Sequence, residues 1–377
     1  MLDPETFWLK FESLGVNFAT GVPDSLLKDF CYFLEDNLPK KRHIIAANEG
    51  GSIAIAAGHY ISSEKPALVY MQNSGIGNAI NPLLSLADEK VYSIPMILIV
   101  GWRGEPGVKD EPQHAKQGQI MIDLLKALRI KYRIVSPQDD NEDEIAKTAY
   151  ENAMINKSPY VLLIKKGTFK GNSSSPKDLS NNFLNRESVI EIITNYLPRN
   201  SVVVSTTGHI SRELYEIRKK NKCHENIDFL TVGSMGHSSQ IALSIAINKP
   251  NLNIFCIDGD GSFLMHMGSA AINGNLGLNN FNHIVLNNGS HGSVGGQPTV
   301  GFNTNLINIA KSCNYKNLYG PIDNFETLKF NLRESLLASG PKFMEVYVDN
   351  LSRKDLGRPK ETPLENKLDI MQKIKNL

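Results

Sequence analysis

The sequence predicts an α/β protein made of two doubly wound parallel-sheet domains. Short runs of β-branched and apolar residues alternate with longer segments whose apolar residues recur at helical spacing, as in a parallel sheet with crossover helices. The alternation pauses in a polar stretch rich in Ser, Lys and Asn and then restarts. With 377 residues, each domain has room for its own core. We therefore place a first domain at 1–170, a linker at 171–185 and a second domain at 186–377.

The strands of the first domain are expected where β-branched and apolar residues cluster between turn signals. In chain order, these runs lie at residues 16–20, 43–47, 67–71, 95–100, 132–135 and 160–164. The intervening segments carry apolar residues at helical spacing, so we expect crossover helices there. The segment 50–60 is rich in Gly, Ala and Ile, which is typical of a helix buried on most of its circumference.

The second domain repeats this plan without repeating the residues. Its expected strands lie at residues 201–206, 228–233, 253–259, 283–288 and 343–348. Ligands of open α/β sheets bind beyond the carboxyl ends of the strands. The loops that follow these strands are therefore the places to look for chemistry.

Composition excludes several classes of partner. Forty basic residues against thirty-nine acidic ones create no global field for nucleic acid or a membrane surface. The amino terminus lacks a basic region followed by an apolar core, and no apolar run approaches the length of a membrane span, so we expect a cytoplasmic protein. The cysteines at 31, 223, 256 and 313 show no metal-ligand spacing and are expected to be reduced thiols.

A Gly-Asp-Gly sequence follows the strand expected at 253–259. Asp260 stands between two glycines, and Asn288 follows 28 residues later, at the end of the next expected strand. Because a strand–helix–strand unit returns the chain beside itself, both side chains can face one ion. Oxygen ligands of this kind suit Mg²⁺, which also retains phosphate oxygens of a ligand. Each piece alone is equally typical of an Asx turn, but the two at this spacing indicate a metal site.

This pairing of GDG with a later NN resembles the motif of the thiamine diphosphate enzymes, and the resemblance extends over both halves. It implies a pyrimidine-binding first domain and a diphosphate-binding second domain. It also implies that Asp260, Asn288 and the carbonyl of Ser290 hold Mg²⁺. The implied cofactor-binding residues of the second domain are Gly233, Met235, Gly259, Asp260, Gly261, Ser262 and Asn288. Met235 of "GSMG" would support the bent cofactor, although a buried core methionine is the alternative.

Glu49 places a carboxylate at the start of the apolar segment 50–60. It is either a charge partner for a helix N-terminus or an acid whose protonated form is favoured by apolar surroundings. By the family resemblance, Glu49 hydrogen-bonds the aminopyrimidine ring of a cofactor shared with a partner subunit, which implies a homo-oligomer with active sites at the subunit interface. Gly75 and Asn78 are implied to contact the cofactor as well.

Within this family, the two-domain plan without a middle domain resembles the phosphonopyruvate and sulfopyruvate decarboxylases. The matching segments are "GVPDS", "MQNSGIGNAINPLLSLA", "GWRGEPGVKDEPQH", "NNGSHGSVGGQPT" and "RKDLGRP". The resemblance implies decarboxylation of 3-phosphonopyruvate to phosphonoacetaldehyde and CO₂ in phosphonate biosynthesis, with thiamine diphosphate and Mg²⁺. Sulfopyruvate or another 2-oxo acid is the first alternative substrate. A catalytically silent cofactor-binding scaffold is the second alternative. The joint presence of Glu49, Asp260, Asn288 and Met235 argues against it, because a scaffold needs no activating acid.

An anionic 2-oxo acid requires positive groups at one end of its pocket. Arg103, Lys109 and His114 lie in the segment after the strand expected at 95–100 and are candidate substrate contacts, with a solvated charged loop as the alternative. Asp24 and Ser25 are expected to begin a helix as N-terminal caps. The resemblance also makes both residues candidate catalytic and substrate contacts.

The segment 290–299, "SHGSVGGQPT", follows the expected metal ligands. Its Gly and Ser residues can form an anion nest or a lid, so Ser293, Gly296, Gln297 and Thr299 are candidate contacts for the substrate. A mobile loop tip is the alternative. His291 is a candidate proton relay, although a solitary histidine is more often structural.

Overall fold

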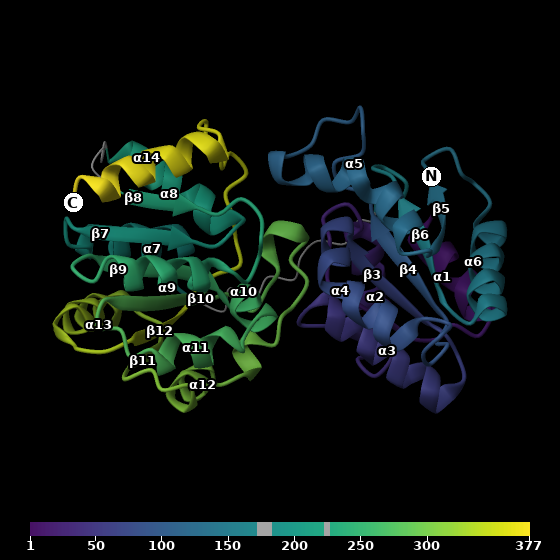
Figure 1. Ribbon diagram of the computed structural model, residues 1–377, viewed down its shortest axis with the longest axis horizontal. Helices are drawn as coiled ribbons and strands as arrows, with labels where there is room; N and C mark the ends of the chain where they lie inside the picture. The colour runs from purple at the N-terminus through teal and green to yellow at the C-terminus, as the bar shows by residue number, and fades with distance from the viewer. Residues whose placement is uncertain (172–182, 222–226) are drawn as a thin grey trace. The chain divides into compact units, whose positions relative to one another are not determined.

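The computed structural model describes residues 1–171, 183–221 and 227–377. The chain divides into two compact units, 1–176 and 177–377, and each is described here by itself (Figure 1). Of the predicted linker 171–185, residues 172–182 lie outside the described residues.

Unit 1 contains a six-stranded parallel sheet. Its helices are α1 (Pro4–Ser13), α2 (Lys28–Asn37), α3 (Glu49–Ser63), η1 (Asn73–Gly75), α4 (Ile76–Pro82), η2 (Leu83–Ala87), α5 (Pro112–Ala127) and α6 (Glu142–Asn156). Its strands are β1 (Ala19–Gly21), β2 (His43–Ile45), β3 (Ala67–Gln72), β4 (Met96–Gly101), β5 (Lys131–Val135) and β6 (Pro159–Ile164). The strand order is β2-β1-β3-β4-β6-β5, and all pairs are parallel.

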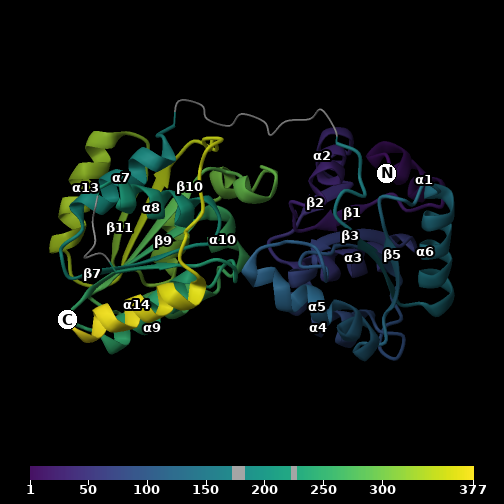
Figure 2. The ribbon, with the colours of Figure 1, turned by 90° about the horizontal axis from the view of Figure 1, so that it is seen from above.

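Both faces of this sheet are covered by helices, as Figure 2 shows. One core packs α1, α2 and α6 against the sheet, and the other packs α3, α4, η2 and α5. The central strands β3, β4 and β6 are buried almost throughout, which explains why they read as continuous apolar runs.

Unit 2 repeats the architecture. Its helices are α7 (Arg186–Tyr196), α8 (His209–Lys220), α9 (Ser238–Asn248), α10 (Asp260–Met265), α11 (Ser269–Asn275), η3 (Gly292–Val294), η4 (Gly301–Asn303), α12 (Leu306–Ser312), α13 (Phe325–Leu337) and α14 (Pro363–Lys375). Its strands are β7 (Ser201–Ser205), β8 (Ile227–Leu230), β9 (Asn253–Gly259), β10 (Phe281–Asn287), β11 (Asn317–Ile322) and β12 (Lys342–Tyr347). The parallel order is β11-β12-β10-β9-β7-β8.

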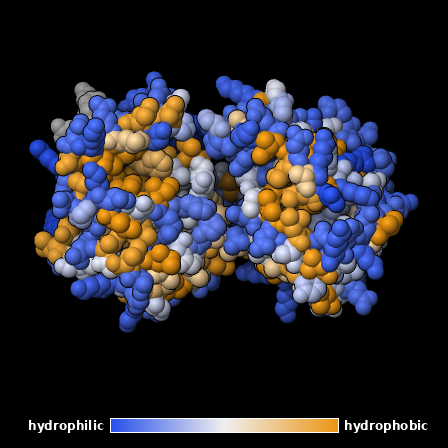
Figure 3. Space-filling model, in the orientation of Figure 1, coloured by the Kyte–Doolittle hydropathy of each residue, from blue (hydrophilic) through white to orange (hydrophobic). Residues whose placement is uncertain are grey.

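Two cores again lie on the two faces of the sheet. Helices α7, α8 and α13 cover one face, and α9 to α12 with α14 cover the other. The outward side of α14 exposes Leu364, Leu368 and Met371, and Figure 3 shows hydrophobic side chains on the surface over this helix. Apolar surface of this kind is typical of contact surfaces.

The predicted fold class is confirmed, and one strand was missed. Among the described strands, β11 is an edge strand whose neighbour is β12, with an irregular register between Tyr319 and Ile322. Its sequence, "NLYGPI", contains a Gly-Pro pair, and most of its residues are at least partly exposed. Pro and Gly are tolerated at a sheet edge, but they read as a turn in the sequence.

Among the described residues, none of the helices is both long and apolar enough to cross a membrane. The described cysteines Cys31, Cys256 and Cys313 are free thiols, as expected. Cys223 lies outside the described residues.

Candidate active site

Glu49 is the first residue of α3 and lies at the carboxyl edge of the unit 1 sheet. The side chain of Asn48 caps the helix by accepting a hydrogen bond from the Gly51 N–H at 2.8 Å, so the chain turns into the helix at Glu49. Only 6% of Glu49 is exposed. The family resemblance implied such a carboxylate at this edge.

Two other predicted cofactor contacts lie against Glu49. Asn78, on α4, donates through Nδ2 to Glu49 Oε2 at 2.8 Å. A Cβ atom at Gly75 would lie 2.5 Å from Glu49 Cγ, so only glycine allows the carboxylate to approach this backbone. The structure thus brings Glu49, Gly75 and Asn78 together at the end of β3, in the arrangement expected for one ligand-binding edge.

Asp24 follows β1 and is fully buried. Its carboxylate accepts hydrogen bonds from Gln72 Nε2 at 2.8 Å and from the Leu26 N–H at 3.2 Å. Burial raises the pKa of Asp24, outweighing the opposing effects of the Gln72 hydrogen bond and the Arg103 charge. The two hydrogen bonds hold this carboxyl in one orientation at the end of β1.

The prediction that Asp24 and Ser25 begin a helix is wrong. Helix α2 begins at Lys28 and has no side-chain cap. The Asp24 carboxylate instead closes a local turn through Leu26. This turn competes with helix formation at the same position.

Arg103 lies in the loop after β4 and is held by an acid that the sequence analysis did not select. Its Nε and Nη2 donate to the two carboxylate oxygens of Asp110 at 2.8 and 2.5 Å, and its Nη1 donates to Ser25 Oγ at 2.7 Å. The same carboxylate accepts from the Gly104 N–H at 2.8 Å and lies 3.0 Å from His114 Nδ1. The charge of Arg103 is therefore already compensated.

Burial opposes the charged form of Asp110. The hydrogen bonds from Arg103, His114 and Gly104 outweigh that effect and hold the pKa of Asp110 well below its usual range. Asp110 is therefore ionised throughout the neutral pH range and keeps Arg103 and His114 in place.

The other two basic candidates, Lys109 and His114, lie in different environments. His114 is not in the loop but in the first turn of α5 (Pro112–Ala127), where it is buried beside Asp110. Lys109 is exposed and makes no hydrogen bond or ion pair with another described residue. The three basic groups therefore do not form one cluster. Arg103 and His114 contact Asp110, whereas Lys109 is exposed to solvent.

Asp260 begins α10 directly after β9, and Asn288 follows β10, the strand hydrogen-bonded to β9. The Asn288 N–H donates to Asp260 Oδ1 at 3.3 Å, and the Thr299 hydroxyl donates to Asp260 Oδ2. Only 1% of Asp260 is exposed, and burial raises its pKa to about 6. No described Lys or Arg forms an ion pair with it, so this buried carboxylate fits a hard cation.

The backbone turns tightly after Asn288. Asn288 Oδ1 accepts from the Ser290 N–H at 3.0 Å, and Ser290 pairs with Pro298 in an isolated antiparallel bridge. The carboxylate of Asp260, the amide of Asn288 and the carbonyl of Ser290 thus come from one short stretch of the sheet edge. Their role as metal ligands stays a prediction.

Ser262, which follows β9, is hydrogen-bonded to residues that follow β7 and β8. Its hydroxyl accepts hydrogen bonds from the Gly236 N–H at 3.0 Å and from Thr206 Oγ1 at 2.9 Å. A Cβ atom at Gly261 would lie 3.4 Å from the methyl carbon of Met235. The "GSMG" turn with Gly233 and the Gly259–Ser262 turn therefore lie together, as the resemblance implied.

The turn between β7 and α8 was missed by the sequence analysis. Thr206 and His209 lie there, and the first turn of α8 carries no acidic residue, which leaves the positive end of the helix available to an anion. Burial lowers the pKa of His209 to about 4, and the charges of Arg186 and Arg212 add to this effect. The signal was present in "STTGH", a Gly-containing turn directly after an expected strand.

The loop from Ser290 to Thr299 is closed by its own backbone. The His291 N–H donates to the Gln297 carbonyl at 2.8 Å, and the Thr299 N–H donates to the Gly289 carbonyl at 2.8 Å. Burial lowers the pKa of His291 to about 4, so its ring is uncharged at neutral pH. Gln297 is buried, whereas Ser293 is exposed at the turn.

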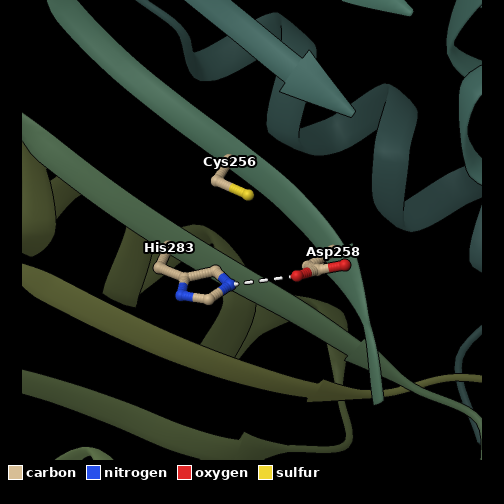
Figure 4. Close-up of side chains that lie close together, drawn as sticks. All are labelled: Cys256, Asp258 and His283. Atoms are coloured by element: carbon tan, nitrogen blue, oxygen red, sulfur yellow. Dashed lines mark hydrogen bonds and ion pairs between the residues drawn. The ribbon is translucent and has the colours of Figure 1, made fainter. Parts of the chain in front are cut away.

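A buried polar cluster lies on the neighbouring strands β9 and β10 (Figure 4). Cys256 and Asp258 on β9 face His283 on β10. His283 Nε2 lies 3.4 Å from Asp258 Oδ2, and its Nδ1 lies 3.0 Å from the Tyr315 hydroxyl. Asp258 Oδ1 also accepts from the Gly259 N–H at 3.0 Å. These contacts fix the end of β9, from which Asp260 projects.

Comparison with known proteins agrees with both halves of this description. The model of the thiamine pyrophosphate enzyme N-terminal TPP binding domain matches residues 8–128, and that of the C-terminal TPP binding domain matches residues 206–346. Phosphonopyruvate decarboxylase of Streptomyces viridochromogenes is 33% identical over 368 residues, which cover 93% of this chain and 90% of the relative.

Two further relatives follow the same pattern. Phosphonopyruvate decarboxylase of Streptomyces hygroscopicus is 31% identical, covering 93% of this chain and 89% of its own length. Sulfopyruvate decarboxylase of Methanosarcina acetivorans is 24% identical, with 87% and 84% covered. The chain therefore belongs to the phosphonopyruvate decarboxylase family of thiamine pyrophosphate enzymes, and it is a carboxy-lyase.

Proposed function

We propose that this enzyme decarboxylates 3-phosphonopyruvate to phosphonoacetaldehyde and CO₂, with thiamine diphosphate and Mg²⁺, as a step of phosphonate biosynthesis. The observation that carries the proposal is the 33% identity to a phosphonopyruvate decarboxylase over 93% of the chain, against 24% to a sulfopyruvate decarboxylase. Sulfopyruvate is the competing substrate, because its sulfonate has the same tetrahedral shape as a phosphonate.

Asp260, Asn288 and the Ser290 carbonyl would hold Mg²⁺. The buried Asp260 carboxylate, without a cation among the described residues, supports this role. Gly259, Gly261 and Ser262, with the turn before α8, would cradle the diphosphate, and Met235 with Gly233 would support the ring system. When bound, thiamine diphosphate supplies the electron sink for loss of CO₂.

Glu49 is the proposed activating acid, with its carboxyl holding a proton at the pyrimidine nitrogen N1′. Its burial and its hydrogen bond from Asn78 support this role, because both fix the carboxyl in one orientation. Gly75 keeps the backbone clear of the carboxyl. We further propose that the cofactor is shared between subunits of a homo-oligomer, with Glu49 supplied by the partner.

Asp24 is the proposed proton donor to the product carbon. Its burial and its hydrogen bonds from Gln72 and the Leu26 N–H, which hold the carboxyl in one orientation, support this role. Ser25 is a proposed substrate contact, because the hydrogen bond from Arg103 uses an acceptor site on Ser25 Oγ and leaves its proton for a ligand. Arg103, whose charge is compensated by Asp110, would hold Ser25 in position for the substrate.

The loop residues Gly296, Gln297 and Thr299 are proposed to close over the substrate. The fixed backbone of this loop and the attachment of Thr299 to Asp260 support a position beside the metal ligands. A closed site also helps catalysis, because CO₂ departs more readily from a poorly solvated carboxylate.

A substrate panel tests the proposal. The enzyme, with Mg²⁺ and thiamine diphosphate, is offered phosphonopyruvate, sulfopyruvate and pyruvate, and CO₂ release gives kcat/KM for each. We expect phosphonopyruvate to give the highest value. A higher kcat/KM for sulfopyruvate would assign the enzyme to the competing function.

A further inference from the structure

Two consecutive amide side chains at the end of β3 contact two different parts of the unit 1 site. Gln72 Nε2 donates to Asp24 Oδ1 at 2.8 Å. Asn73 Nδ2 donates to the Arg103 carbonyl at 2.9 Å, and Asn73 Oδ1 accepts from the Arg103 N–H at 3.1 Å. Strand β3 lies between β1 and β4, so this short segment ties the residues that follow both neighbouring strands.

These contacts close into a ring. Arg103 Nη1 donates to Ser25 Oγ at 2.7 Å, and Ser25 is the chain neighbour of Asp24. The ring therefore runs through Asp24, Gln72, Asn73, Arg103 and Ser25, and a peptide bond joins its last member to its first. In a closed ring, moving one member strains the links on both sides, so each side chain is held by its neighbours.

The two amides are themselves fixed. The Ser74 hydroxyl donates to Gln72 Oε1 at 2.6 Å, which leaves Gln72 Nε2 directed at the carboxylate of Asp24. Asn73 is only 4% exposed, and its amide offers a donor and an acceptor to the backbone of one residue. The Arg103 N–H also lies 3.1 Å from the Gly101 carbonyl, so the donor to the Arg103 carbonyl is the contact that depends on Asn73.

Asn73 and Asp110 hold Arg103 in different ways. Asp110 binds the guanidinium and also accepts from the Gly104 N–H, so it fixes the side chain relative to its own loop. Asn73 fixes the backbone of Arg103 relative to β3. Without Asn73, the Arg103–Asp110 pair could stay intact and still move as a unit away from Ser25.

We propose that Asn73 is a positioning residue for the decarboxylation: it fixes the backbone of Arg103, and through Arg103 it holds Ser25 in one arrangement. Asn73 acts on Arg103 and not on a ligand. The proposal rests on the proposed function, in which Asp24 donates a proton and Ser25 contacts the substrate. It adds that these two neighbouring groups are placed by a residue that follows a different strand.

A double-mutant cycle tests whether Asn73 acts through Arg103. Asn73→Leu removes both hydrogen bonds at similar volume, and Asn73→Asp keeps the acceptor but replaces the donor with an oxygen. Each substitution is made alone and together with Arg103→Ala. For every variant, kcat/KM is measured with phosphonopyruvate and with pyruvate, and thermal unfolding of the ligand-free protein is recorded.

Asn280→Leu is the matched control. Asn280 precedes β10, at the amino end of the unit 2 sheet, and its Nδ2 likewise donates to backbone carbonyls, those of Ala246, Lys249 and Leu252. Its loss removes a structural contact of the same chemistry from a place where no site residue is proposed.

We expect both Asn73 substitutions to lower kcat/KM for phosphonopyruvate about ten-fold and to lower that for pyruvate less. In the Arg103→Ala background, the same substitutions should change kcat/KM by less than about two-fold, because the guanidinium that Asn73 positions is gone. Asn280→Leu should lower the unfolding temperature and leave kcat/KM unchanged.

The proposal is overturned if both Asn73 variants keep the wild-type kcat/KM, or if their losses multiply with that of Arg103→Ala. It is also overturned if Asn280→Leu lowers kcat/KM as much as Asn73→Leu does, because lost stability would then explain both. If Arg103→Ala affects neither substrate, Asn73 has nothing to act through and the proposal fails. If the wild-type enzyme decarboxylates sulfopyruvate and not phosphonopyruvate, the proposed function fails, but the same cycle measured with sulfopyruvate still decides the role of Asn73.

Discussion

The loop after β4 in unit 1 and the loop after β10 in unit 2 are both predicted to meet an anion, and they are built in opposite ways. In the first loop, Arg103 is clamped by Asp110 and its charge is compensated. In the second loop, Gln297 carries no charge, yet its amide is buried and unpaired among the described residues. The two loops therefore offer an anion different chemistry, a compensated cation in the first and a buried uncharged amide in the second.

The largest effect is expected from removing the Asp260 carboxylate, which is buried and has no cation partner among the described residues. Asp260→Ala deletes one hard ligand and leaves the diphosphate charge uncompensated. We expect cofactor affinity in the presence of Mg²⁺ to fall by at least about a hundred-fold, with the far-UV circular dichroism of the fold unchanged. Calorimetric titration measures the loss, and wild-type affinity in this variant would remove Asp260 from the metal site.

The next effect concerns Glu49, the corresponding carboxyl of unit 1. Glu49→Gln keeps the shape but removes the exchangeable carboxyl proton, so we expect the cofactor to bind normally while exchange of its C2 proton slows by about 10²- to 10⁴-fold. Proton exchange followed by NMR on the enzyme-bound cofactor checks this. Unchanged exchange would contradict the assignment of Glu49 as the activating acid.

Substitution of Arg103 tests the loop after β4, in which the charged side chain is paired. Arg103→Ala frees Asp110 and removes the donor to Ser25 Oγ. We expect kcat/KM for phosphonopyruvate to fall about ten- to a hundred-fold. The kcat/KM for pyruvate should fall less. Arg103→Lys should recover only part of the loss, because an ammonium lacks the planar fork that fits Asp110.

Equal losses on both substrates would make Arg103 a purely structural clamp for the loop. Unchanged kinetics on both would make the loop a surface segment. Either result leaves the uncharged groups of unit 2 as the remaining candidates for recognising the phosphonate.

The smallest effect is expected on the pH dependence of stability, through the buried side chain of His43. His43 contacts the Tyr70 hydroxyl at 2.8 Å, and burial lowers its pKa from 6.5 to about 4. Between these pH values the unfolded chain binds a proton that folded His43 does not, so the free energy of unfolding falls as pH is lowered from 6.5 to 4, by up to about 1.4 kcal/mol per pH unit. Denaturant unfolding of His43→Gln should show a shallower pH dependence, and an identical dependence would contradict the shift.

Most of the fold was predictable because each strand of the sheet interiors is a continuous apolar run. The runs at 67–71 and 95–100, for example, correspond to β3 and β4 within one residue at each end. The exception, β11, lies at an edge, where one neighbouring strand replaces two and the burial pattern is lost. The other edge strands, β2, β5 and β8, were predicted from their apolar runs, so β11 was missed because of its Gly-Pro pair as well as its exposure.

The candidate site was predictable where one motif fixes several groups at once. Asp260 and Asn288 follow adjacent strands, so their meeting follows from the topology. The partnership of Arg103 with Asp110 was not predictable, because the acid lies within a run of alternating charges and several pairings fit the sequence equally well. Burial without a partner, as at Gln297, is likewise visible only in three dimensions.

The central claim is tested most directly by ³¹P NMR of phosphonopyruvate incubated with the enzyme, Mg²⁺ and thiamine diphosphate. The account predicts that the phosphonopyruvate resonance is replaced by that of phosphonoacetaldehyde, and that Glu49→Gln abolishes this change on the same timescale. Persistence of phosphonopyruvate with the wild-type holoenzyme, under conditions in which sulfopyruvate is decarboxylated, would contradict it.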